Sequence, residues 1–188
     1  MADPHFVGMT VFTIGHSTRS VEELLDLLRQ AGVDWVVDVR SYPRSRRNPQ
    51  FNDDVLPGAL AEAGVGYRHM RGLGGRRGGR ELDYPSPNGF WESAGFRNYA
   101  DYALTPAFRE ALASLMELAE HRTVAVMCAE AVWWRCHRRI ITDYLLAEGV
   151  AVRHILGPGQ IEPASMTPEA ESQPDGGIHY PASQPSLF

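Results

Sequence analysis

The sequence predicts an α/β domain in which about five strands form a mainly parallel sheet with helices on both faces. Short apolar segments alternate along the chain with longer segments of helical periodicity, which favours parallel strands joined by helical crossovers. Residues 35–39 are apolar apart from one aspartate, as expected for a strand that is buried on both faces of a parallel sheet.

Helix signals separate the first three expected strands. Ser20 is a suitable N-cap, acidic residues follow in the first turn, and a leucine stripe continues until Gly32 ends the helix. Gly64 ends a second expected helix in the same way. The elements expected in this half are strands at residues 10–14, 35–39 and 65–69 and helices at residues 21–31 and 53–63.

The second half begins with a long segment rich in glycine and proline, residues 72–95, which is expected to be a loop. Thr105 is a suitable N-cap with Pro106 at the first helical position, and Gly149 ends the last long helix. The elements expected here are helices at residues 96–104, 106–120 and 135–148 and strands at residues 124–128 and 150–156.

The chain is expected to contain one structured domain with two flexible ends. Residues 1–9 are expected to be a flexible N-terminus, and residues 10–157 are expected to form the α/β domain. Residues 158–188 are rich in Pro, Gly, Ser, Gln and Glu. A segment of that composition buries too little apolar surface to fold, so we expect a disordered acidic tail.

Composition and charge bound the class of protein. With 44% hydrophobic and 22% charged residues, the 188-residue chain is typical of a globular domain, and its net charge of −5 gives no global attraction to nucleic acid. All 18 basic residues are arginines; nine lie between Arg40 and Arg80, against three acidic residues. Two cysteines eight positions apart make no disulfide framework, and no signal peptide or membrane-spanning segment is visible, so we expect a cytoplasmic protein.

The segment 124–139 concentrates residues that could carry chemistry. In an open α/β sheet, ligands bind outside the carboxyl ends of the strands, and the expected strand 124–128 ends on a cysteine there. His16 and Arg40 follow other expected strands, so we expect all of these side chains to meet in one cleft. The catalytic candidates are Cys128, Glu130, His137 and His16, and the substrate-binding candidates are Arg40, Arg44, Arg135, Arg138, Trp133 and Trp134.

Each candidate has a functional and a structural interpretation. Cys128 at a strand end, near arginines and a helix N-terminus, would have a low thiol pKa, or it is a small buried residue. Cys136 is expected to be a packing residue. Glu130 is a general base or an ion-pair partner for an arginine, and the tryptophans stack a base or cover the core. Asp38, inside an apolar strand, is expected to be paired with an arginine.

A metal site is not predicted, and the sequence identifies no cofactor. Cys128, Cys136 and His137 could bind zinc, but a fourth ligand and the usual ligand spacing are missing.

Several short motifs stand out in the sequence. They are Thr13-Ile-Gly-His-Ser17, Val36-Val-Asp-Val-Arg40 with Pro43, Leu73-Gly-Gly75, Phe96-Arg-x-Tyr-Ala100, Cys128-Ala-Glu130 and Cys136-His-Arg138. As a set, these motifs resemble a bacterial family described as domain of unknown function 488. The resemblance spans residues 10 to about 156, implies a compact α/β domain, and brings no established reaction. It implies a site made of His16, Arg40, Cys128, Glu130, Cys136, His137 and Arg138.

A more distant resemblance is to rhodanese-like domains. Val36-Val-Asp-Val-Arg40 is similar to their early strand, and Val124-Ala-Val-Met-Cys128 is similar to the strand that leads to their cysteine loop. The resemblance implies a rhodanese-like topology and a loop whose backbone N–H groups cradle an anion or a persulfide. This chain departs from that pattern, because six residues separate Cys128 from Arg135 and one of them is Glu130, which would repel an anion.

The last five residues, Gln184-Pro-Ser-Leu-Phe188, resemble the short peptide by which bacterial DNA polymerases and repair proteins bind the replication sliding clamp. In such peptides the glutamine is hydrogen-bonded and the Leu-Phe pair fills an apolar pocket. The resemblance implies that Gln184, Leu187 and Phe188 bind the clamp.

Three functions are compatible with the sequence. The first is an enzyme acting on a nucleic acid or nucleotide in DNA repair or replication, with arginines on the phosphates and no membrane association. The second is a rhodanese-like sulfurtransferase or another cysteine-dependent enzyme that acts on a small molecule. The third is a non-catalytic adaptor that binds nucleic acid and the clamp.

Overall fold

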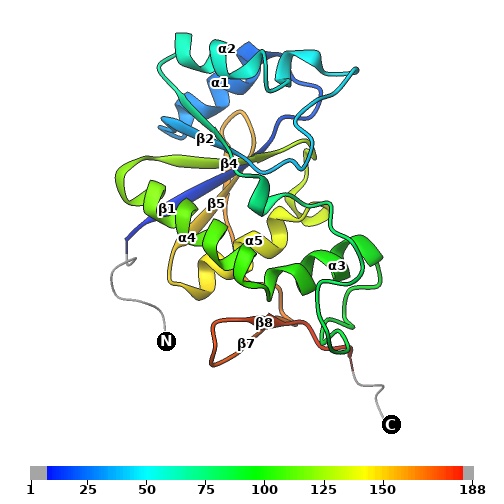
Figure 1. Ribbon diagram of the computed structural model, residues 1–188. Coiled ribbons are helices and arrows are strands. Elements are labelled where there is room, and N and C mark those ends of the chain that lie inside the picture. Colours follow the sequence, from blue (N-terminus) through cyan, green and yellow to red (C-terminus); the bar gives the residue numbers. More distant parts are fainter. Residues whose placement is uncertain (1–7, 184–188) are drawn as a thin grey trace.

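The structure, a computed structural model, describes residues 8–183 and contains a six-stranded sheet in the order β3-β2-β4-β1-β5-β6 (Figure 1). Neighbouring strands are parallel except β5 and β6, so the predicted α/β fold with a mainly parallel sheet is confirmed. The strands are β1 (Thr10–Gly15), β2 (Trp35–Asp38), β3 (Gly66–His69), β4 (Val124–Cys128), β5 (Ala151–Gly157) and β6 (Gln160–Pro163). Most of the expected flexible N-terminus lies outside the described residues.

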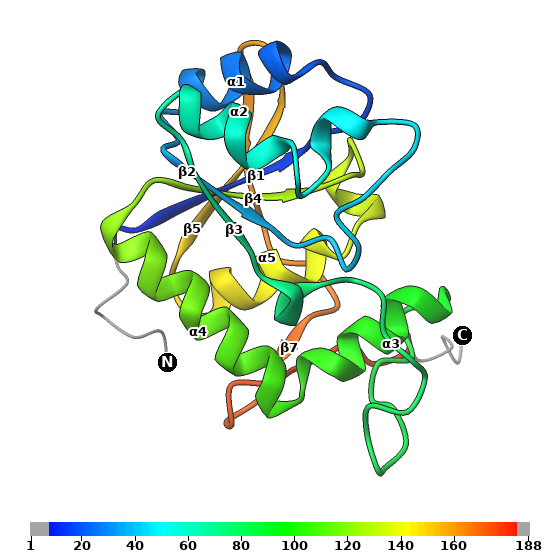
Figure 2. The same cartoon turned by 45° about the horizontal axis from the view of Figure 1, so that its top comes forward.

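Helices cover both faces of the sheet (Figures 1 and 2). On one face lie α1 (Val21–Gln30) and α2 (Leu56–Glu62), and on the other lie α3 (Ala94–Ala103), α4 (Pro106–His121) and α5 (Arg138–Ala147). The strands supply both cores because successive side chains point to opposite faces: Val36 packs towards α1 and α2, and Val37 packs towards α4 and α5. Within the described part of the chain, no helix has the length and apolarity needed to cross a bilayer.

Local sequence signals set most helix boundaries. Ser20 and Glu23 form a capping box at the start of α1, and the Thr105 side chain accepts a hydrogen bond from the Phe108 N–H at the start of α4. The helix expected from Arg135 begins instead at Arg138, after a short 3₁₀ turn (η4, Trp133–Arg135). Cys136 lies between the two in extended conformation, with φ −130° and ψ 150°, which interrupts the helix.

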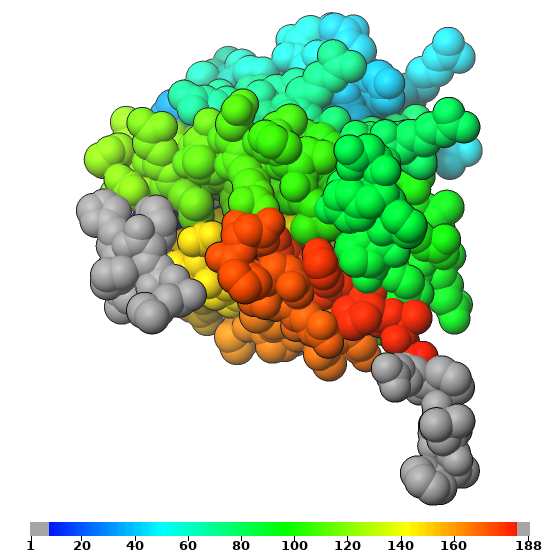
Figure 3. Space-filling model, turned by 60° about the horizontal axis from the view of Figure 1, so that its bottom comes forward, coloured from blue at the N-terminus to red at the C-terminus, as the bar shows by residue number. Residues whose placement is uncertain are grey.

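The expectation that the chain is disordered from residue 158 is wrong for residues 158–183. This segment first adds β6 to the edge of the sheet and then forms a hairpin of β7 (Glu171–Ser172) and β8 (Ile178–His179). The hairpin packs over the helices on the face of the sheet that carries α3, α4 and α5 (Figure 3). Ile178 and Tyr180 are fully buried. Buried Asp143 of α5 accepts hydrogen bonds from the Thr167 N–H, at 2.8 Å, and from the Tyr180 hydroxyl, at 2.8 Å. The segment is therefore ordered despite its polar composition, because it buries two apolar side chains and supplies the hydrogen-bond donors that the buried Asp143 carboxylate requires.

Candidate functional site

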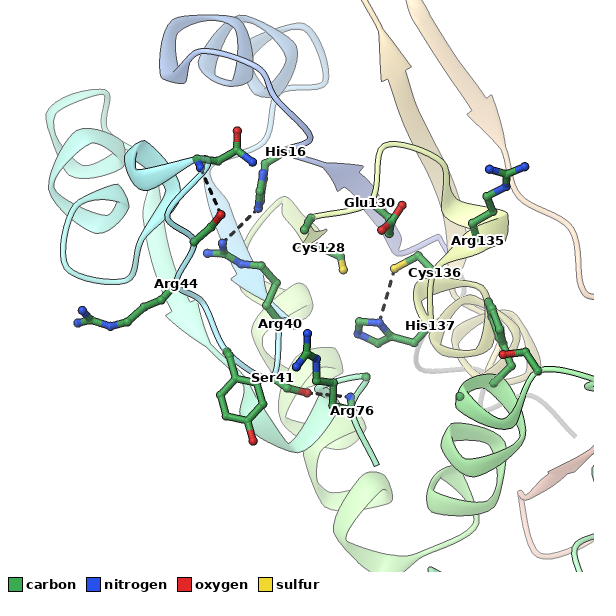
Figure 4. Close-up of a pocket in the computed structure, with 18 residues that line it drawn as sticks. His16, Arg40, Ser41, Arg44, Arg76, Cys128, Glu130, Arg135, Cys136 and His137 are labelled. Carbon is green, nitrogen blue, oxygen red and sulfur yellow. Dashed lines mark hydrogen bonds between the residues drawn. The ribbon is translucent and has the colours of Figure 1, made fainter. Parts of the chain in front are cut away.

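A pocket of about 610 Å³ lies at the carboxyl edge of β1, β2 and β4 (Figure 4). The adjoining turns are held in register, because the His16 N–H donates to the Cys128 carbonyl at 2.9 Å and the Val39 N–H donates to the Met127 carbonyl at 2.9 Å. The structure brings most of the sequence candidates together in this pocket: His16, Arg40, Arg44, Cys128, Glu130, Arg135 and His137 all line it, together with Cys136.

Three other candidates do not line the pocket. Trp133 stacks on His154, with ring centroids 4.4 Å apart and planes 9° apart, and Trp134 is nearly half exposed. Arg138 is 1% exposed and lies behind the pocket wall. The sequence expected these three side chains to bind the substrate, and none of them lines this pocket.

A glycine at the end of β1 allows the loop that follows β4 to cross the sheet edge. A Cβ atom on Gly15 would overlap the carbonyl oxygen of Glu130, so only glycine permits this close approach. The Ser17 N–H then donates to the Ala129 carbonyl at 3.0 Å. The loop places Glu130 at the rim of the pocket, where its side chain faces solvent. Its carboxylate has no hydrogen-bond partner within residues 8–183.

Two cysteines and a histidine form a compact cluster at the pocket wall. The Cys128 Sγ, Cys136 Sγ and His137 Nδ1 atoms all lie within 4.8 Å of one another. His137 Nε2 lies 2.9 Å from the Val39 carbonyl oxygen, and because a carbonyl can only accept, Nε2 carries the proton. In its neutral form His137 therefore directs the lone pair of Nδ1 towards Cys136 Sγ, 3.5 Å away. Gly75 packs against the imidazole, where a Cβ atom would overlap the ring.

The pKa shifts of the two cysteines differ from the sequence expectation, which gave the low thiol pKa to Cys128. The hydrogen bond that Cys128 donates to Cys136, together with burial, raises the pKa of Cys128 to about 12. Burial by itself would raise the pKa of Cys136, but the hydrogen bond from Cys128 and the charge and N–H groups of Arg138 lower it to about 6. Cys136 is thus the favoured thiolate. The sequence reasoning missed this because the two cysteines contact each other only in the folded chain.

Arg138 supports the site from inside the domain. Its Nε and its backbone N–H point to Cys136 Sγ at 3.4 and 3.5 Å, and its Nη2 donates to the Glu130 carbonyl. Nη1 lies 3.5 Å from the Thr13 hydroxyl. A single buried guanidinium therefore connects the thiolate, the crossing loop and β1, which makes Arg138 a positioning residue.

His16 and Arg40 belong to a second buried network at the opposite wall. Arg40 donates from Nε and Nη2 to the Asp38 carboxylate, at 2.9 and 2.6 Å, so the predicted pairing of Asp38 with an arginine is confirmed. His16 Nδ1 donates to the Ser17 carbonyl at 2.8 Å, and its Nε2 accepts from Arg40 Nη1 at 3.1 Å. Burial lowers the pKa of His16 to about 4. Because both ring nitrogens are engaged, His16 has no free lone pair with which to act as a general base.

The arginines at the rim differ in their engagement. Arg44 is paired with Asp53 at 2.9 Å and with Asp54 at 3.4 Å. Arg135 is exposed, and its guanidinium has no partner among the described residues. Arg76, which the sequence reasoning did not single out, also lines the pocket, and its guanidinium lies over the Tyr42 ring at 5.5 Å. Its place directly after the Leu73-Gly-Gly75 motif was the signal that could have identified it.

Comparison with known protein families yields a match over most of the chain. Residues 20–145 match the family described as Domain of unknown function DUF488. The chain belongs to the DUF488 family. The range matched to DUF488 includes the Cys128–Arg138 segment and Arg40 but not His16. No curated protein and no solved structure matches the chain, so a relationship to rhodanese-like domains is not shown.

Proposed function

We propose that this DUF488 protein is an enzyme that acts on a phosphate-bearing substrate, either a nucleotide or a nucleic acid. The observation that carries the proposal is a single pocket in which a Cys–Cys–His cluster and a carboxylate, unpaired within residues 8–183, lie among arginines. Arginine side chains bind phosphate through charge-assisted hydrogen bonds. A volume of about 610 Å³ lies within the usual range of small-molecule sites and suits a nucleotide.

The residues divide into binding and reacting groups. Arg76 and Arg135 are exposed at the rim, so their guanidinium groups can bind phosphate without breaking an ion pair within residues 8–183. Cys136 lies beside His137, the arrangement of a nucleophile next to a base, and Glu130 is a second group that can accept a proton. Arg40 stays bound to Asp38, which neutralises its charge, and it forms part of the pocket wall.

Replacing Arg76 or Arg135 by alanine is expected to weaken nucleotide binding about 10- to 100-fold each, since a hydrogen bond to a charged group contributes about 1.5–3 kcal/mol. Calorimetric titration with nucleoside mono-, di- and triphosphates and short oligonucleotides measures this change. Arg29→Ala, which removes an exposed arginine on α1, is the matched control and should bind normally. Equal weakening in the control, or no binding by any nucleotide or oligonucleotide, contradicts the proposal.

A second candidate function is sulfur transfer. The observation that favours it is that Cys136 Sγ lies within 3.5 Å of two N–H groups of Arg138, which would stabilise a sulfur anion, with a second thiol alongside. A thiosulfate–cyanide transfer assay separates the two functions. Turnover that is lost in Cys136→Ser and kept in Arg135→Ala would favour sulfur transfer over phosphate chemistry.

We also propose that the C-terminal peptide tethers the enzyme to the replication sliding clamp, in a repair or replication context. Gln184, Leu187 and Phe188 lie outside the described residues, so the proposal rests on their sequence. Without catalysis, the same two binding functions would make the protein an adaptor. Catalytic turnover of a bound nucleotide, measured alongside binding, distinguishes the enzyme from the adaptor.

Replacing Leu187 and Phe188 by alanine is expected to abolish clamp binding and leave the thermal unfolding midpoint unchanged. Short peptide anchors concentrate their affinity in a few apolar side chains, so removing this pair should remove most of the binding free energy. Surface plasmon resonance on immobilised clamp measures binding, and Ser186→Ala in the same peptide is the control. A wild-type peptide that does not bind the clamp at micromolar concentration rules the tether out.

A further inference from the structure

Cys128, Cys136 and His137 have the chemistry and the spacing of a zinc site. Two thiols and an imidazole are ligands that favour zinc over magnesium or calcium, which prefer oxygen. Zn–S and Zn–N bonds of about 2.3 and 2.0–2.1 Å at a tetrahedral angle place the sulfur and nitrogen about 3.6 Å apart. The Cys136 Sγ and His137 Nδ1 atoms lie 3.5 Å apart, and the Cys128 Sγ lies within 4.8 Å of both.

The surroundings of the cluster also match those of bound zinc. A histidine ligand usually donates its other ring N–H to a carbonyl or carboxylate, and His137 donates Nε2–H to the Val39 carbonyl at 2.9 Å. This contact leaves Nδ1 as the free lone pair on the side of the thiols, as a ligand requires. N–H groups of Arg138 point to the Cys136 sulfur at 3.4 and 3.5 Å, which offsets thiolate charge. Figure 4 shows Cys128, Cys136 and His137 directed towards one another.

We propose that these three residues bind a single zinc ion whose fourth coordination position faces the pocket. The sequence argued against such a site because two of the ligands are adjacent in the chain and no fourth ligand follows. The extended conformation of Cys136 resolves the first objection, since it interrupts the helix between η4 and α5 where both side chains turn to Cys128. The second objection becomes a property of the site, because three protein ligands with one open position are typical of catalytic zinc.

Glu130 lines the same pocket but does not belong to the ligand cluster. Zinc lowers the pKa of a bound water to about 7, so a water in the open position could release its proton to the Glu130 carboxylate. The resulting hydroxide would make the pocket hydrolytic. This consequence rests on the proposed function, whereas the zinc site itself does not.

The test is metal titration of the full-length protein after removal of bound metal with a chelator. We expect one Zn²⁺ per chain with sub-micromolar affinity. Co²⁺, added as a spectroscopic probe, should give thiolate-to-metal charge-transfer absorption and the intense visible bands of tetrahedral coordination. Cys128→Ser, Cys136→Ser and His137→Gln should each weaken zinc binding more than about 100-fold, beyond the 10- to 100-fold effect of losing an outer partner.

Two controls separate ligation from general damage. His121→Gln, an exposed histidine at the end of α4, should bind zinc normally, and Glu130→Gln should keep wild-type affinity because Glu130 is not a ligand. Circular dichroism checks that each variant is folded. If a cysteine variant fails to fold, protection of wild-type Cys136 from iodoacetamide by one equivalent of zinc, together with the thiolate bands of the Co²⁺ complex, tests ligation without it.

Specific outcomes overturn the site. Absence of sub-micromolar zinc binding, a Co²⁺ spectrum without thiolate bands, or equal affinity in Cys128→Ser and the wild type would each reject it. Failure of the proposed function is seen separately: nucleotide binding that is absent or insensitive to Arg76→Ala and Arg135→Ala rejects that function whether or not zinc binds.

Discussion

Replacing Asp38 by alanine is expected to lower the free energy of unfolding by about 3–5 kcal/mol, the effect of breaking a buried ion pair on one side. The Asp38 side chain is fully buried and accepts hydrogen bonds from Arg40 and from the Tyr67 hydroxyl, the latter at 2.7 Å. Removing the carboxylate leaves the Arg40 guanidinium buried without its counter-charge. Urea denaturation followed by circular dichroism measures the change.

Asp26→Ala is the matched control, because it removes an aspartate that pairs with an arginine at the surface. Asp26 and Arg29 are 2.8 Å apart, but their side chains are 68% and 62% exposed. Their pair should contribute less than about 1 kcal/mol. Asp38→Asn, which keeps the shape and loses the charge, should fall between the two. A change of less than about 1 kcal/mol in Asp38→Ala would show that the Asp38–Arg40 network does not support the pocket wall.

Alkylation of the metal-free protein should modify Cys136 at least about 100-fold faster than Cys128 at pH 7.5, because only the thiolate reacts. With a pKa of about 6, Cys136 is largely ionised at this pH, whereas Cys128, with a pKa of about 12, stays protonated. The rate at Cys136 should fall about tenfold for each pH unit below 6, as its thiolate is protonated. Iodoacetamide labelling and peptide mass spectrometry assign each rate to its residue.

Unfolding in denaturant supplies the control for this selectivity. Both cysteines should then react at similar rates, since each thiol returns to its ordinary pKa of about 8.5. Cys136→Ser removes the hydrogen-bond partner that raises the pKa of Cys128, so Cys128 should react faster in this variant than in the wild type. Faster modification of Cys128 in the folded wild type would contradict the assignment and restore Cys128 as the working thiolate.

The agreement between sequence and structure is closest where local rules decide. Apolar strands and capped helices depend on neighbours in the chain, so β4 and the start of α4 were placed to the residue. The carboxyl edge of a parallel sheet gathers the ends of its strands, so His16, Arg40 and Cys128 could be expected in one pocket before any coordinates.

The departures occur where distant residues meet. The segment 158–183 has a composition typical of disorder. It is ordered because Asp143 accepts hydrogen bonds from Thr167 and Tyr180, and because Ile178 and Tyr180 are buried in the core. Its composition could not reveal partners that lie on α5. The sequence left Trp133 and Trp134 either to stack a base or to cover the core, and η4 places Trp133 on His154.

The sequence by itself determined the α/β class, the family and the edge of the sheet at which chemistry is possible, because periodicity and motifs are properties of neighbouring residues. Only the tertiary structure decided which thiol is favoured as the thiolate, which arginine is buried behind the site and which rim arginines lack an ion-pair partner within residues 8–183. Those properties depend on burial and on contacts formed in the folded chain, such as those of Arg138 with Cys136 and Glu130. The pKa of a buried group is set by the balance between desolvation and nearby charges, and the fold alone brings those charges within a few ångströms.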